Sequence, residues 1–154
     1  MKRSAGLLLY RWGDREIEVF LVHPGGPFWA KKDRGAWSIP KGEYSDGEDP
    51  LGAARREFKE ETGHAVEGDF LELGAIRQAG GKLVTVWALE GEFDPAELVS
   101  NRFELQWPPQ SGRTIEAPEV DRGGWFLLHE AKDRILASQS PILDRLAEKL
   151  DLQS

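Results

Sequence analysis

The 154-residue sequence contains no cysteine, one methionine and two tyrosines. The absence of cysteine excludes disulfide bonds, cysteine ligands to zinc and thiolate nucleophiles. A chain of this length buries roughly two-thirds of its unfolded surface, so one hydrophobic core can stabilise it without cross-links. We therefore expect a single domain that covers residues 1–154.

Long hydrophobic runs and an excess of basic residues are also missing. The apolar run at residues 5–10 ends at Arg11, which makes it too short for a signal-peptide core or a membrane span. With 27 acidic residues against 20 Lys and Arg, the net charge of −7 disfavours binding to nucleic acid or to anionic membrane. We expect a cytoplasmic protein without a nucleic-acid or membrane partner, in which any polyanionic substrate needs a bridging cation.

The distribution of apolar residues predicts strands mixed with helices, which is typical of an α/β domain with helices packed on a mixed sheet. The expected strands are residues 5–12, 16–22, 37–39, 70–76, 83–89, 103–107 and 125–128. Turns or loops are expected at residues 23–36, 79–81 and 108–112, with a short helical turn beginning at Asp94. A helix is predicted over residues 49–63, with Asp49 as N-cap and Gly63 just past the last turn, and another opens at Ser140 and Pro141.

The helix predicted over residues 49–63 belongs to the most acidic part of the chain. Residues 43–61 contain seven acidic and three basic side chains, so they carry −4 of the net charge of −7. On a helix, the three carboxylates of Glu57, Glu60 and Glu61 fall on one edge, beside the apolar stripe of Leu51, Ala54 and Phe58. Like charges at this spacing destabilise a helix, and a bound divalent cation reverses the sign of that effect. The alternative is a solvated helix face that Arg55, Arg56 and Lys59 neutralise.

The spacing of these acids resembles a family signature, the Nudix box. Gly42 is followed after five residues by Glu48, and after seven more by the run Arg-Glu-Phe-Lys-Glu-Glu-Thr-Gly-His at residues 56–64. All seven fixed identities of the box are present: Gly42, Glu48, Arg56, Glu57, Glu60, Glu61 and Gly63. Phe58 and His64 stand where the family usually has aliphatic residues. Residues 37–42, 118–120 and 125–126 also resemble the family's strand entering the box, its late acidic loop and its last strand.

The resemblance implies a Nudix-type α/β/α sandwich, a central mixed sheet flanked by helices, and a hydrolase that uses Mg²⁺ or, in its place, Mn²⁺. It implies that Glu57, Glu60 and Glu61 bind metal, with the Lys41 carbonyl as a further ligand, and that Glu48 and Arg56 hold each other. The base that activates water is Glu57 or, from the later loop, Glu116 or Glu119.

The resemblance also implies a small-molecule substrate, a nucleoside diphosphate linked to another moiety, such as a nucleoside triphosphate or a dinucleoside polyphosphate. The N-terminal strand and residues 37–42 are similar to the subgroup that cleaves diadenosine polyphosphates, although no tyrosine follows the box. The basic residues before the box are candidates for distal phosphates, or they are merely solvated: Lys31, Lys32, Arg34 and Lys41. Trp29, Trp37 and Trp107 are candidates for stacking on a base, although most tryptophans in such a chain are core residues.

Other functions fit the sequence less well. It contains no P-loop or Gly-x-Gly-x-x-Gly motif, and its three histidines stand singly without a Gly-x-Ser-x-Gly elbow. The main alternative is a non-catalytic nucleotide sensor on the same fold, against which the complete set of acids argues. An RNA-processing enzyme would require a basic channel, which the acidic composition disfavours.

Overall fold

The computed structural model describes residues 2–78 and 80–152. Its main sheet has six strands, in the order β4-β5-β1-β2-β8 with β3 paired to β1. In chain order these strands are β1 (Arg3–Trp12), β2 (Ile17–Pro24), β3 (Lys41–Glu43), β4 (Leu71–Arg77), β5 (Leu83–Glu90) and β8 (Val120–Leu127). Strands β1 and β5 are parallel and the other pairs are antiparallel, so the sheet is mixed as predicted.

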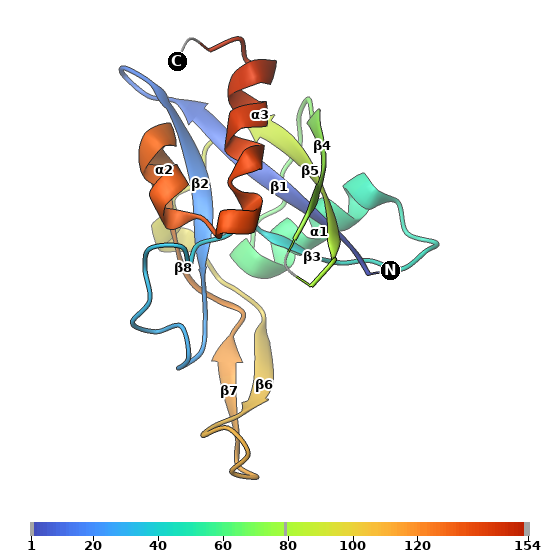
Figure 1. Ribbon diagram of the computed structural model, residues 1–154, viewed down its shortest axis with the longest axis vertical. Helices are drawn as coiled ribbons and strands as arrows, with labels where there is room; N and C mark the ends of the chain where they lie inside the picture. The colour runs from blue at the N-terminus through green and yellow to red at the C-terminus, as the bar shows by residue number, and fades with distance from the viewer. Residues whose placement is uncertain (1, 79, 153–154) are drawn as a thin grey trace.

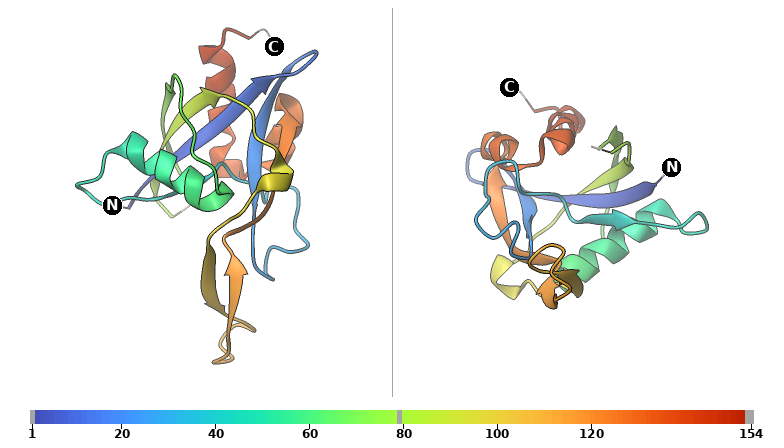
Figure 2. Two further views of the ribbon diagram at one scale, coloured as in Figure 1. Left: turned by 180° about the vertical axis from the view of Figure 1, so that it is seen from behind. Right: turned by 60° about the horizontal axis from the view of Figure 1, so that its bottom comes forward.

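Helices cover both faces of this sheet. Helix α1 (Pro50–Thr62) lies on one face, and α2 (Leu128–Arg134) and α3 (Pro141–Lys149) lie on the other, as Figures 1 and 2 show. One buried cluster joins Phe58 of α1 to Leu7 of β1, and a second joins Leu143 of α3 to Leu8 of β1. Strand β1 is therefore buried on both faces, which explains its continuous apolar sequence. The predicted α/β/α sandwich is confirmed.

Local signals set the limits of α1. The Asp49 side chain accepts a hydrogen bond from the Gly52 N–H at 2.9 Å, and Pro50 occupies the first turn. Gly63 ends the helix in the left-handed region, with φ of 86°, and its N–H donates to the Lys59 carbonyl. A residue with a Cβ is strained in that conformation, so glycine suits this position. The helix predicted over residues 49–63 is confirmed.

A two-stranded hairpin projects from the body of the molecule (Figure 1). It consists of β6 (Arg102–Gln106) and β7 (Thr114–Pro118), and it follows a short 3₁₀ turn, η1 (Pro95–Glu97). Strand β6 was expected, one residue later, and so was the turn, but the sequence analysis did not predict β7. The reason is that only Ala117 of this short strand is buried, so its sequence lacks the apolar run that marks a strand.

Two strand predictions need correction. Residues 37–39 form only isolated bridges, Val22 with Ser38 and Trp37 with Ile135, because the Ile39 N–H donates to the Gln139 side chain instead of to a neighbouring strand. The strand lies at β3, just after Pro40, which has no N–H to donate. The last strand, expected at residues 125–128, begins five residues earlier, at Val120, and Leu128 already belongs to α2.

The remaining segments agree with expectation apart from small shifts. Gly80 and Gly81 of the predicted turn have φ of 87° and 82°, and residue 79 of that turn lies outside the described residues. The end of the chain contains α2, the 3₁₀ turn η2 (Ala137–Gln139) and α3, which begins at Pro141. In the part of the chain that the structure describes, no helix is both long and apolar enough to cross a membrane.

Candidate active site

The acidic edge of α1 faces the interior. Glu57 and Glu61 are each only 8% exposed, on the same side of the helix as the fully buried Ala54 and Phe58. Leu51, expected in the apolar stripe, is partly exposed instead. Burial of two carboxylates costs free energy unless they are paired or bind a ligand. The alternative of a solvated acidic face therefore does not describe Glu57 and Glu61.

Arg56 connects the acids of α1 to the loop before it. Its guanidinium donates two hydrogen bonds to Glu48, at 2.8 and 3.1 Å, which is a bidentate ion pair. It also donates to Glu57 at 2.9 Å, to Glu60 at 3.1 Å and to the Glu43 carbonyl at 3.3 Å. The Glu48 contact lowers the pKa of that carboxyl and raises that of Arg56. Arg56 thus sets the positions of two of the three candidate metal ligands.

Gly42 accommodates the Glu57 carboxylate. A Cβ built on Gly42 would overlap the Cδ and both carboxylate oxygens of Glu57. Only a residue without a side chain lets the carboxylate lie against the β3 backbone. Gly42, the first residue of the motif, therefore lies directly against a side chain that comes fifteen positions later in the sequence.

A cavity of about 190 Å³ lies beside these acids. Glu61 and Lys41 line it from α1 and β3, and Glu119 lines it from the junction of β7 and β8, where β8 begins at the next residue. Trp29 also lines it, from the loop after β2. The lining further includes Val22, Pro24, Ala36, Ser38, Ile39, Val120 and Leu136. Glu119 and Glu61, far apart in sequence, thus meet at one cavity.

The carboxylates raise one another's pKa. Burial raises the pKa of Glu61 well above its ordinary value, and the charges of Glu57 and Glu119 raise it further against the opposing Lys41 ammonium. Burial and Glu60 raise the pKa of Glu57, although its hydrogen bond from Arg56 acts in the opposite direction. Burial, followed by Glu60, raises the pKa of Glu119. Perturbed carboxylates grouped at a cavity are typical of functional sites.

The chemistry of these donors fits a divalent cation. Carboxylate oxygens are the ligands that Mg²⁺ prefers, and a cation would relieve the repulsion that raises these pKa values. Across residues 2–78 and 80–152, no three His, Cys, Asp or Glu side chains converge as a set that could hold a metal ion. In this structure Glu57 and Glu60 each accept a hydrogen bond from the Arg56 guanidinium through one carboxylate oxygen.

The other predicted basic residues lie in different surroundings. Lys41 lines the cavity, and burial lowers the pKa of its ammonium. Lys31 is exposed, the Lys32 ammonium lies 4.3 Å from the ring centroid of Phe28, and Arg34 lies 3.6 Å from Asp133 of α2. Among the described residues, the cavity lining includes Lys41 but none of these three.

The tryptophan and acidic-loop candidates also lie in different parts of the structure. Trp29 lines the cavity, whereas Trp37 is buried in the core and Trp107 follows β6 in the projecting hairpin. Glu116 lies on the exposed face of that hairpin, where it accepts a hydrogen bond from Arg102 at 2.6 Å. Glu119 is therefore the later-loop acid that lies at the cavity.

The contacts of one buried polar residue were not predicted from the sequence. His23, treated as an isolated histidine, is fully buried between Asp121 and the Lys32 carbonyl. Asp121 lies 98 positions away in the sequence, so no local pattern signals the pair.

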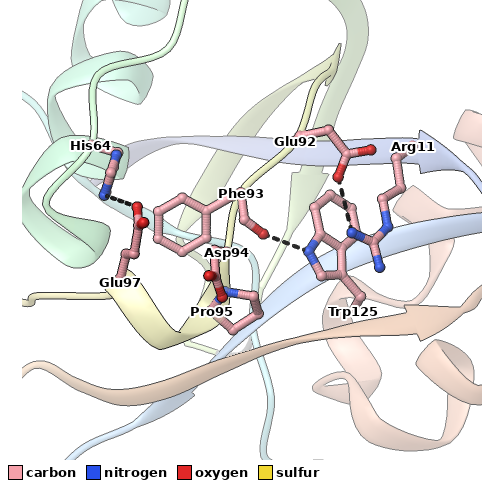
Figure 3. Close-up of a pocket in the computed structure, with 8 residues that line it drawn as sticks. All are labelled: Arg11, His64, Glu92, Phe93, Asp94, Pro95, Glu97 and Trp125. Atoms are coloured by element: carbon pink, nitrogen blue, oxygen red, sulfur yellow. Dashed lines mark hydrogen bonds and ion pairs between the residues drawn. The ribbon is translucent and has the colours of Figure 1, made fainter.

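A larger cavity of about 450 Å³ is drawn in Figure 3. Two of its lining residues, Arg11 and Glu92, form an ion pair at 3.0 Å, and His64 Nε2 lies 3.6 Å from Glu97. The Trp125 indole donates to the Phe93 carbonyl at 2.8 Å. Among the described residues, its lining includes neither the box acids nor Glu119, so its size does not make it the candidate active site.

Comparison with known proteins identifies the family. The model of the NUDIX domain matches residues 1–146. This protein therefore belongs to the NUDIX family, as the box resemblance implied.

Two relatives are similar in sequence. An 8-oxo-(d)GTP phosphatase of Mycolicibacterium smegmatis is 33% identical over 123 residues, which cover 70% of this chain and 34% of that protein. An RNA pyrophosphohydrolase of Rhizobium meliloti is 29% identical over 115 residues, which cover 65% of this chain and 64% of that protein. The chain thus spans about a third and just under two-thirds of the length of these relatives.

Solved structures share the fold. An Ap4A hydrolase of C. elegans in a binary complex has a TM-score of 0.66 and 24% identity, and covers 96% of this chain and 98% of its own. The NUDIX domain of Shewanella oneidensis NrtR in complex with ADP ribose has a TM-score of 0.66 and 17% identity, with coverage of 96% and 87%. At these identities the similarity shows the fold alone.

Proposed function

We propose that these residues form one NUDIX hydrolase domain that cleaves a pyrophosphate bond in a nucleoside diphosphate linked to another moiety, with Mg²⁺ or Mn²⁺. The observation that carries the proposal is the meeting of Glu61, Glu119 and Lys41 at one cavity, beside the buried carboxylate of Glu57. Burial of this many acids opposes folding, so packing alone does not account for them. A catalytic role for the acids does.

In this proposal Glu57, Glu60 and Glu61 bind the metal, and the Lys41 carbonyl adds a further ligand. Bound divalent ions neutralise a diphosphate and lower the pKa of the attacking water. The chain supplies the geometry, because Arg56 aligns Glu57 and Glu60 and is itself held by Glu48. The Lys41 ammonium, which lines the cavity, can donate to a phosphate oxygen.

We propose Glu119 as the general base and Glu57 as the alternative. Glu119 lines the cavity together with Glu61, and burial raises the pKa of its carboxyl toward the working pH. A base is most effective when its pKa lies near that pH. Glu119 would accept the proton of the water that attacks the phosphorus atom.

The cavity and the relatives support the proposed substrate class. Trp29 offers an aromatic surface at the cavity, and we propose that Lys31 and Lys32, in the same loop, contact distal phosphates outside it. The relatives are named for 8-oxo-(d)GTP and for RNA, and the structural neighbour for Ap4A. Both 8-oxo-(d)GTP and Ap4A contain a nucleoside attached to a chain of phosphates.

A substrate screen tests this proposal. Purified protein with Mg²⁺ is offered nucleoside triphosphates including 8-oxo-dGTP, dinucleoside polyphosphates, nucleotide sugars and 5′-triphosphorylated RNA, and the products are identified. We expect a nucleoside monophosphate or diphosphate product that disappears in excess chelator. Full turnover in excess chelator would contradict the metal assignment.

Glu57→Gln tests the box itself. The substitution removes a charge and keeps the shape, so kcat should fall by roughly 10² to 10⁴-fold with little change in melting temperature. Glu67→Gln is the matched control, because that side chain is 86% exposed and pairs only with Arg55. A wild-type rate in Glu57→Gln would remove Glu57 from the site.

The non-catalytic sensor remains the second candidate, since the similar NrtR domain is in complex with ADP ribose. Replacing Glu60 and Glu61 together by Gln separates the two by calorimetry with a non-hydrolysable dinucleoside polyphosphate. The hydrolase loses turnover and also nucleotide affinity, because the phosphates lose their bridging cations. Tighter, metal-independent binding by the double variant, without turnover by the parent, would support the sensor.

A further inference from the structure

His23 lies where three segments of the cavity wall meet. It is the second-last residue of β2, its ring is fully buried, and it packs edge-on against Trp37 at a centroid distance of 5.2 Å. Its Nδ1 lies 2.9 Å from Asp121 Oδ1 on β8, and its Nε2 lies 2.6 Å from the Lys32 carbonyl oxygen in the loop after β2. One side chain thus joins both segments to β2.

Both partners of the His23 ring are hydrogen-bond acceptors. A backbone carbonyl only accepts hydrogen bonds, and the Arg122 guanidinium lies 3.6 Å from the same Asp121 oxygen that contacts the ring. Asp121 and Arg122 are the charged groups that face this ring, and the Lys32 ammonium is turned away toward Phe28. The ring therefore contacts Asp121 of β8 with one nitrogen and the carbonyl of Lys32 with the other.

The Asp121 contact coincides with an irregularity in the sheet. His23 pairs with Arg122, whereas the next residue, Pro24, pairs with Val120, so Asp121 is an extra residue in β8. Such a bulge redirects side chains, because a shift of one residue moves each following position to the other face. Glu119 stands two residues before Asp121 and directly before β8, so the backbone at the bulge leads into Glu119.

The Lys32 contact holds the turn that carries Trp29. The Lys32 N–H donates to the Trp29 carbonyl at 2.9 Å, and His23 then bonds the Lys32 carbonyl from inside the molecule. The Gly25 N–H donates to the Glu119 carbonyl at 3.0 Å, which fixes the other end of this part of the loop. The two walls of the cavity are therefore both attached to His23.

We infer that His23 is a positioning residue of the active site: through Asp121 it sets Glu119, and through the Lys32 carbonyl it sets Trp29. This inference rests on the proposed function. The two effects depend on different ring nitrogens. Nδ1 contacts Asp121, which positions Glu119, and Nε2 contacts the Lys32 carbonyl, which positions Trp29.

Two variants dissect the ring. In His23→Gln the side-chain amide nitrogen replaces Nε2 and keeps the Lys32 bond, so we expect kcat to fall by about 100-fold with KM unchanged, as for a misplaced catalytic group. In His23→Asn the amide replaces Nδ1 and keeps the Asp121 bond, so KM should rise about five- to tenfold with kcat nearly unchanged. His129→Gln and His129→Asn are the matched controls, because that side chain is 71% exposed and remote from the cavity.

A double variant tests whether His23 acts through Glu119. If it does, His23→Gln should cause no further loss of kcat in a Glu119→Gln background, because the group that it positions is already gone. An additional loss of kcat in that background would overturn the inference. Equal changes of kcat and of KM in His23→Gln and His23→Asn would also overturn it, because they would indicate general destabilisation.

Nuclear magnetic resonance supplies a readout that does not depend on turnover. We expect the Trp29 indole signal to move in His23→Asn but not in His23→Gln. An unmoved indole signal in both variants would overturn the positioning role. If the wild-type protein hydrolyses no nucleotide, the proposed function fails, and these signals still decide whether His23 holds the Trp29 turn.

Discussion

Gly42→Ala should damage the active site without damaging the fold. An added Cβ would lie 2.1 to 2.3 Å from the atoms of the Glu57 carboxylate, which must withdraw by about 1.2 to 1.4 Å to reach an ordinary separation of about 3.5 Å. The obstacle is the end of a flexible side chain, and Gly42 does not have a positive φ, so the backbone itself accepts alanine. The free energy of unfolding should change by less than about 1 kcal/mol.

The effect on catalysis should be larger than the effect on stability. A displacement of about 1 Å in a catalytic group costs about 100-fold in rate, or about 3 kcal/mol of transition-state stabilisation. We therefore expect kcat/KM of Gly42→Ala to fall about 100-fold at saturating Mg²⁺, with a higher Mg²⁺ requirement. The assay is steady-state hydrolysis of the best substrate from the screen, alongside thermal unfolding.

Gly47→Ala is the matched control for this substitution. Gly47 lies in the loop between β3, which contains Gly42, and α1, and a Cβ built there meets no atom within 4 Å. This variant should keep wild-type kcat/KM and melting temperature. Wild-type activity in Gly42→Ala, or an equal loss in Gly47→Ala, would refute the claim that Gly42 exists to seat Glu57.

Three further predictions follow from the same contacts. Burial raises the folded-state pKa of Glu61. In chelator, the contribution of Glu61 to stability is therefore present below the ordinary carboxyl pKa of about 4.3 and is lost as the pH rises through the folded-state pKa. Glu61→Gln should remove this loss of stability in thermal unfolding and should also reduce the stabilisation by Mg²⁺. A wild-type melting profile in Glu61→Gln would contradict this. Arg56→Ala should lower kcat and melting temperature together, because it releases the bidentate Glu48 contact, whereas Arg55→Ala, whose exposed side chain lies 3.6 Å from Glu67, should change neither. Glu119→Gln should reduce kcat by roughly 10² to 10⁴-fold if it is the base, and a drop below tenfold would assign that role to Glu57.

The sequence by itself determined the features that depend on near neighbours. Asp49 and Gly63 mark the ends of α1, because caps act within one turn of the helix. The spacing of Glu57, Glu60 and Glu61 places them on one edge wherever the helix lies. The apolar run of β1 and the family resemblance of residues 42–64 also needed no tertiary information.

Only the tertiary structure decided how these pieces meet. The burial of Glu57 and Glu61, the seat that Gly42 provides and the arrival of Glu119 at the same cavity all depend on contacts between separate elements. The contact of His23 with Asp121 also depends on the tertiary structure. The pairing of β2 with β8 and the bulge in β8 bring the two residues together, and no pattern in either strand predicts that bulge. Local periodicity reports which face a residue takes within its own element. The register between elements, which decides what that face meets, is set by packing across the whole chain.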